Sequence, residues 1–129
     1  MNENPRTAVV VVDDEPPIVD VVCDVLQDEG FTTVSCQHGR EAYACILQSR
    51  PELVILDIQM PEVDGIQVFR QVRAEPRTQH IPVIFFTANS HILQQRLPNY
   101  HELGAELLPK PFDVDSLLEL VSKSLVSHP

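Results

Sequence analysis

The chain has 129 residues, of which 43% are hydrophobic and 22% charged, and we expect one globular domain over residues 1–129 with its core at about 7–126. A formal net charge of −10 would repel a phosphate backbone, which disfavours direct nucleic-acid binding. No apolar run is long enough for a membrane span, and no apolar leader precedes the first predicted strand, so we expect a cytoplasmic protein with no membrane partner.

Five apolar runs along the chain predict short β-strands. They cover residues 8–12, 31–36, 53–57, 81–86 and 106–108. Most consist of consecutive aliphatic or aromatic residues without polar alternation, which is typical of strands buried on both faces of a parallel sheet. The second run is more polar, and we expect it near an edge of that sheet.

A segment with helical spacing of apolar residues follows each strand. These segments cover residues 16–29, 40–49, 66–75, 92–103 and 114–125. The fourth contains Pro98, so we expect that helix to be broken or to start late. The alternation predicts an α/β fold, a doubly wound parallel sheet of five strands in the flavodoxin-like order 2-1-3-4-5, flanked by five helices.

Polar side chains stand where the apolar runs stop. Asp13 and Asp14 follow the first run, Asp57 ends the third, Thr87 follows the fourth and Lys110 follows the fifth. Singly, each has an ordinary explanation, such as acids at a helix N-terminus or a strand end at a turn. Together they predict a site, because the carboxyl ends of parallel strands share the edge where ligands bind.

The residue types at this edge favour phosphoryl chemistry. Three carboxylates remain ionised close together only if a cation compensates them, and an all-oxygen set suits Mg²⁺. An ammonium and a hydroxyl, from Lys110 and Thr87, would neutralise a transferring phosphoryl group. A carboxylate can act as nucleophile and form an acyl phosphate, and Asp57 on the central strand is the candidate.

With these residues assembled, the chain resembles the CheY-like receiver domain of two-component response regulators. The resemblance covers nearly the whole chain. It rests on Asp13-Asp14, residues 56–61 with Asp64-Gly65, Thr87-Ala88 and Lys110-Pro111-Phe112. It implies a receiver fold with a phosphorylation switch as its function.

In that family a histidine kinase or histidine phosphotransfer protein donates the phosphoryl group. The resemblance implies that Asp57 accepts it and that Thr87 and Lys110 contact its oxygens. It further implies a signalling switch in a phosphorelay, without turnover of a small molecule, acting on a downstream protein target or an effector domain. We identify no effector domain in the sequence, so a stand-alone regulator and the receiver part of a longer protein remain alternatives.

The resemblance also implies a ligand set for Mg²⁺. Asp14, Asp57 and the backbone carbonyl of Gln59 would hold the ion, with Asp13 contributing through a water molecule. A cis peptide bond before Pro111 is expected as well.

Three features depart from the family pattern. Leu107 stands where an aromatic residue is usual, three positions before the lysine. Pro98 interrupts the fourth helix, and the segment 104–110 is one residue short, so the signalling face there is expected to be remodelled. Gln59 and Asn89 occupy variable positions beside the path of attacking water, and we hypothesise that these amides set the lifetime of the phosphoryl group.

Two enzyme or binding functions on similar folds would need residues that differ from those of this chain. A haloacid-dehalogenase-type phosphatase would have a second acid two residues after the nucleophile, where this chain has Gln59. A flavin or nucleotide binder would have a glycine-rich loop, and the chain has only 4 Gly. A receiver-like adaptor that is never phosphorylated is the remaining alternative, and the complete acidic set with Thr87 and Lys110 argues against it.

Overall fold

Five parallel strands form the centre of the computed structural model, which describes residues 8–126. The strands are β1 (Ala8–Val12), β2 (Thr32–Cys36), β3 (Leu53–Asp57), β4 (Val83–Thr87) and β5 (Ala105–Pro109). Their order is β2-β1-β3-β4-β5. The predicted order is therefore confirmed, with the more polar strand β2 at one edge. The ends of the predicted domain, residues 1–7 and 127–129, lie outside the described residues.

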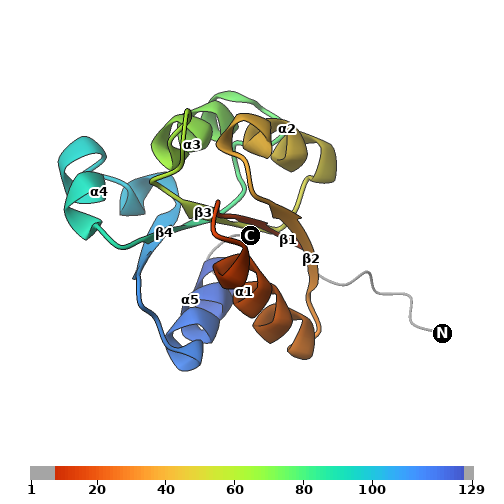
Figure 1. The fold of residues 1–129 in the computed structure, drawn as a ribbon. Coiled ribbons are helices and arrows are strands. Elements are labelled where there is room, and N and C mark those ends of the chain that lie inside the picture. Colours follow the sequence, from red (N-terminus) through yellow and green to blue (C-terminus); the bar gives the residue numbers. More distant parts are fainter. Residues whose placement is uncertain (1–7, 127–129) are drawn as a thin grey trace.

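Helices cover both faces of the sheet. They are α1 (Pro16–Asp28), α2 (Gly39–Ser49), α3 (Gly65–Ala74), α4 (Ser90–Arg96) and α5 (Val114–Val126). Figure 1 shows α2 and α3 on one face, α1 and α5 on the other, and α4 beside β4. Within residues 8–126 no helix has the length and apolar character needed to cross a bilayer.

Alternate residues of each strand supply two separate cores. Val10, Val54 and Phe85 point toward α2 and α3, where Phe69 packs on Phe85 with ring centroids 5.1 Å apart. Their neighbours in sequence, such as Val11 and Ile55, pack under α1 and α5. Because both faces are buried, the strand sequences are apolar without alternation.

The connection from β4 to β5 differs most from regular helix geometry. The predicted fourth helix is broken, as expected, but it starts at Ser90 and does not start late. It ends at Arg96, and Pro98 follows one residue after its C-cap Leu97 because the proline ring cannot continue the helix. A short 3₁₀ helix, His101–Leu103, then leads into β5.

One arginine of α3 fixes this connection. Arg73 donates hydrogen bonds from Nε to the Leu103 carbonyl at 2.7 Å, from Nη1 to Ile81 at 2.7 Å and from Nη2 to Gly104 at 3.2 Å. The guanidinium also lies over the Phe69 ring, 4.6 Å from its centroid. Arg73 thus ties the start of β4 and the start of β5 to the third helix.

Candidate functional site

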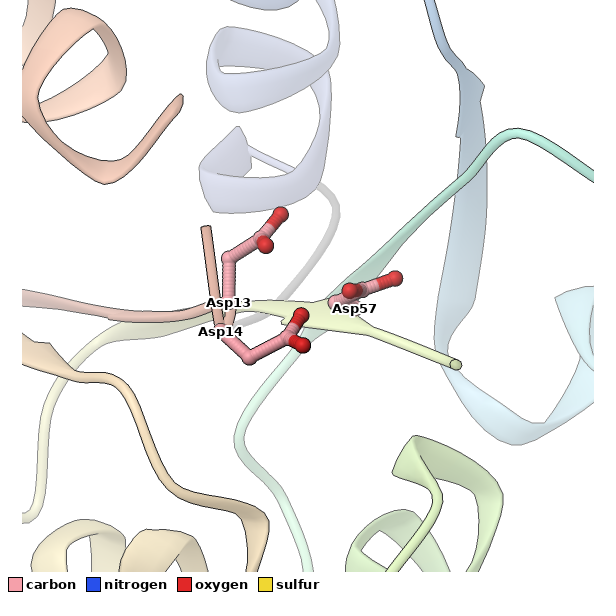
Figure 2. Close-up of side chains that lie close together, drawn as sticks. All are labelled: Asp13, Asp14 and Asp57. Atoms are coloured by element: carbon pink, nitrogen blue, oxygen red, sulfur yellow. The ribbon is translucent and has the colours of Figure 1, made fainter. Parts of the chain in front are cut away.

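Three carboxylates meet at the carboxyl edge of β1 and β3. One oxygen from each of Asp13, Asp14 and Asp57 lies within 4.8 Å of the others, and Figure 2 shows the three side chains gathered at the ends of the two strands. Asp13 is fully buried, Asp57 is 4% exposed and Asp14 is half-buried. The predicted convergence of these acids is what the structure shows.

The backbone around Asp57 is closely packed against the start of α3. A Cβ added to Gly65 would lie 2.1 Å from the Asp57 carbonyl oxygen, and the Gly65 amide donates to the Ile58 carbonyl at 2.8 Å. On the other side, the Gln59 amide donates to Asp57 Oδ1 at 3.3 Å. The start of α3, capped by Asp64 through the Gln67 amide, therefore holds the loop that follows Asp57.

Lys110 reaches the acids from the turn after β5. Its Nζ lies 2.8 Å from Asp13 Oδ2 and 3.6 Å from Asp57 Oδ2, and only 13% of its side chain is exposed. The Lys110 amide donates to the Thr87 carbonyl at 2.8 Å, which anchors the turn to β4. The peptide bond before Pro111 is cis, as expected.

Thr87 and Gln59 stand at the same edge, and their side chains differ in exposure. The Thr87 hydroxyl is buried, accepts a hydrogen bond from the Asn89 amide at 3.0 Å and donates to the Asn89 carbonyl at 3.4 Å. The Gln59 side chain is exposed. Of the predicted site residues, the structure thus brings together Asp13, Asp14, Asp57 and Lys110. It leaves the Thr87 hydroxyl bonded to Asn89.

Two contacts of Lys110 were not predicted from the sequence. Glu15 Oε1 accepts a hydrogen bond from its Nζ at 3.4 Å, and the Phe86 ring centroid lies 4.7 Å from the same nitrogen. Glu15 follows the acidic pair directly, so its position was a signal. Phe86 gave none, because an aromatic residue in a buried strand is core by default.

The site carries more negative charge than its lysine can offset. Burial and the neighbouring charge of Asp13 raise the pKa of Asp57 to about 7, although Lys110 and the Gln59 amide act in the opposite direction. For Lys110, burial lowers the pKa, but the Asp13 hydrogen bond and the surrounding carboxylates outweigh it, and the pKa is raised. The excess of anionic oxygens fits a hard divalent cation such as Mg²⁺.

A model of the family described as "response regulator receiver domain" matches residues 9–122. The chain belongs to this family. The transcriptional regulator RpaA of Synechocystis, described as DNA-binding, is 34% identical over 113 residues, which are 88% of this chain and 46% of RpaA. The receiver domain described here thus spans less than half of that curated relative.

Solved structures agree with the assignment of this receiver domain. The chemotaxis protein CheY4 of Vibrio cholerae superposes with a TM-score of 0.83 at 28% identity, covering 94% of this chain and 100% of CheY4. TrrA of Thermotoga maritima, solved in complex with Mg²⁺-BeF, gives a TM-score of 0.81 at 34% identity over 92% of this chain and 99% of TrrA. The resemblance and the CheY-like fold expected from the sequence are therefore confirmed.

Proposed function

We propose that this receiver domain is a Mg²⁺-dependent phosphorylation switch that accepts its phosphoryl group on Asp57. The observation that carries the proposal is the position of the Asp57 carboxylate: it is buried, ends the central strand, and lies 3.6 Å from the Lys110 ammonium and beside Asp13 and Asp14. A carboxylate held so close to a cation and two further acids suits attack on a phosphorus atom whose charge is neutralised at the same place.

In the proposed reaction an Asp57 oxygen attacks phosphorus and the bond from phosphorus to the donor breaks. Lys110 would contact the phosphoryl oxygens, since its ammonium already lies beside Asp57. The Thr87 hydroxyl would exchange its bonds with Asn89 for a phosphoryl oxygen. This exchange would couple the state of Asp57 to the start of α4, and such a coupling is what a two-state switch requires.

The proposed Mg²⁺ ligands are Asp14, Asp57 and the Gln59 backbone carbonyl, with Asp13 acting through water. When bound, the ion supplies positive charge for the phosphoryl oxygens. The chain's own part is to hold these oxygens in place: Asp57 by the bond from the Gln59 amide, and Asp13 by its bond from Lys110. The Mg²⁺-BeF complex of TrrA supports this proposal.

The proposed phosphodonor is a histidine kinase or histidine phosphotransfer protein, and the proposed reader is a downstream protein or an effector domain. RpaA is described as DNA-binding, but the net charge of −10 supports protein contacts for this domain and no direct contact with nucleic acid. We propose a switch without small-molecule turnover. The cytoplasmic location and the single-domain span remain predictions.

Intact mass spectrometry tests the proposal. The protein is incubated with acetyl phosphate in Mg²⁺ or in EDTA, alongside the variants Asp57→Asn and Asp20→Asn, the latter replacing an exposed acid of α1. We expect a one-phosphoryl mass increase for the wild type and Asp20→Asn in Mg²⁺ only. An adduct that persists in Asp57→Asn or in EDTA would contradict the proposed chemistry, and no adduct at all would favour a non-phosphorylated adaptor.

A further inference from the structure

The Lys110 ammonium lies beside Asp57 but donates its hydrogen bonds to two other acids. Its two hydrogen bonds go to Asp13 Oδ2 at 2.8 Å and to Glu15 Oε1 at 3.4 Å, whereas Asp57 Oδ2 is farther, at 3.6 Å. The Phe86 ring lies 4.7 Å from the same nitrogen. The lysine is therefore shared between two acids that do not accept the phosphoryl group and one that does.

Glu15 differs from Asp13 and Asp57 in its exposure to solvent and in lying outside the proposed metal site. Its side chain is 59% exposed, against 0% for Asp13 and 5% for Asp57. It has no place in the proposed metal site. Its backbone is fixed independently, because the amide donates to Asp13 Oδ1 and the carbonyl accepts from Ile18 and Val19 at the start of α1. The side chain can therefore change without loss of the helix start.

We infer that Glu15 is a positioning residue that keeps the Lys110 ammonium beside Asp13 and so limits its availability to a phosphoryl group on Asp57. The inference rests on the proposed function. An arriving phosphoryl group must draw Lys110 from Glu15, and the contact with Glu15 opposes that movement. Glu15 thus sets how readily the switch is phosphorylated, although it touches no reacting atom.

Acetyl phosphate is a small phosphodonor with which the transfer to Asp57 can be written atom by atom. An Asp57 oxygen attacks phosphorus, the phosphorus–oxygen bond to acetate breaks, and acetate leaves with the electron pair. Lys110 neutralises charge on the transferred oxygens without giving up its proton. Because exposed ion pairs are weak, loss of the Glu15 contact should raise the rate of this step by about two- to fivefold.

Two substitutions separate the contact from the charge. Glu15→Gln keeps the length of the side chain and removes its charge. Glu15→Asp keeps the charge and withdraws the carboxylate by one methylene group, beyond the 3.4 Å contact with Lys110. If the contact is what matters, both variants should release the lysine, whereas a purely long-range effect of charge would leave Glu15→Asp like the wild type.

The first measurement observes Lys110 directly in the metal-free protein. The sequence contains two lysines, Lys110 and Lys123, so NMR of the side-chain ammonium groups gives two signals at most. In both Glu15 variants we expect the Lys110 signal to shift and its hydrogens to exchange faster with water. The signal of Lys123, which lies 3.6 Å from Glu106, should not change. An unchanged Lys110 signal in Glu15→Asp would overturn the inference.

The second measurement is the rate of phosphorylation by acetyl phosphate at saturating Mg²⁺, followed by intact mass. Both Glu15 variants should react about two- to fivefold faster than the wild type, and this gain should vanish in a Lys110→Gln background, where no ammonium remains to be released. Asp20→Asn serves as the charge control and should match the wild type.

The outcomes separate this inference from the function on which it rests. A wild type that takes no phosphoryl group would refute the proposed function and the role of Glu15 with it. Normal phosphorylation of the wild type with equal rates in the Glu15 variants would overturn only the inference. A rate gain that persists in the Lys110→Gln background would also overturn it, because the effect would then not act through the lysine.

Discussion

Replacement of Asp57 by asparagine should stabilise the metal-free fold at alkaline pH, although it removes the proposed phosphoacceptor. Asparagine keeps the shape of the side chain and can still accept the hydrogen bond from the Gln59 amide. It removes one of three charges that lie within 4.8 Å of one another. The wild type bears this repulsion when no cation is bound, and the variant does not.

The size of the effect follows from the pKa of Asp57, which burial and Asp13 raise from 3.8 to about 7. The folded protein therefore keeps this proton to a higher pH than the unfolded chain, and the wild type loses stability as the pH rises from about 4 to about 7. At about 1.4 kcal/mol per unit the full shift corresponds to roughly 4 kcal/mol. Because the site meets solvent at the half-buried Asp14, its electrostatic interactions are partly screened, and we expect about 2 to 4 kcal/mol at pH 8.

The assay is urea unfolding in EDTA at several pH values between about 4 and 8, followed by far-ultraviolet circular dichroism. The difference in unfolding free energy between Asp57→Asn and the wild type should be near zero at the acidic end and grow to its full value by about pH 7. Asp20→Asn, which removes an exposed charge, is the control. A difference that does not change with pH, or a less stable Asp57→Asn at pH 8, would show that the charge of Asp57 does not destabilise the metal-free fold.

Three further predictions concern the metal, a close backbone contact and the half-buried Arg73. At pH 8, Mg²⁺ at about 100 times its dissociation constant should stabilise the wild type by about 2.7 kcal/mol. Calorimetry should show that most of this gain is lost in Asp57→Asn and Asp14→Asn. Equal gains in all three proteins would exclude the proposed ligands. Gly65→Ala should lower the unfolding free energy by about 3 kcal/mol, because the new Cβ would lie 2.1 Å from the Asp57 carbonyl oxygen. A loss below about 1 kcal/mol in urea unfolding would show that the backbone of this loop can move to make room. Arg73→Met removes the hydrogen bonds to the Leu103 and Ile81 carbonyls, whereas the Gly104 carbonyl keeps the bond from the Val83 amide. This variant should cost about 2 to 3 kcal/mol, and Arg70→Met, at an exposed position, should cost less than about 0.5 kcal/mol. Equal losses in urea would contradict the role of Arg73.

The strands and the acidic edge could be predicted because one physical pattern specifies both. Strands buried on both faces must be apolar throughout, so the first polar residue marks where the sheet meets solvent. Asp57 is such a residue, and the doubly wound topology then places the ends of neighbouring strands together. The pairing of Val12 with Leu56 sets the ends of β1 and β3 level, which brings Asp13 and Asp57 face to face.

Helix boundaries and side-chain directions were harder to predict from the sequence. Pro98 predicts a break in the fourth helix, but where the helix starts depends on the bonds between Thr87 and Asn89, which the apolar spacing does not encode. The contact of Lys110 with Glu15 joins residues 95 positions apart. An exposed glutamate has many conformers, and only the folded position of the lysine selects one of them.

We propose that Asp57, and neither of the neighbouring acids, carries the phosphoryl group. Its most direct test is to treat the phosphorylated protein with borohydride, which reduces an acyl phosphate to an alcohol, and to locate the modified residue by peptide mass spectrometry. We expect that Asp57 alone is converted to homoserine. Conversion at Asp13 or Asp14 with Asp57 unmodified would contradict it.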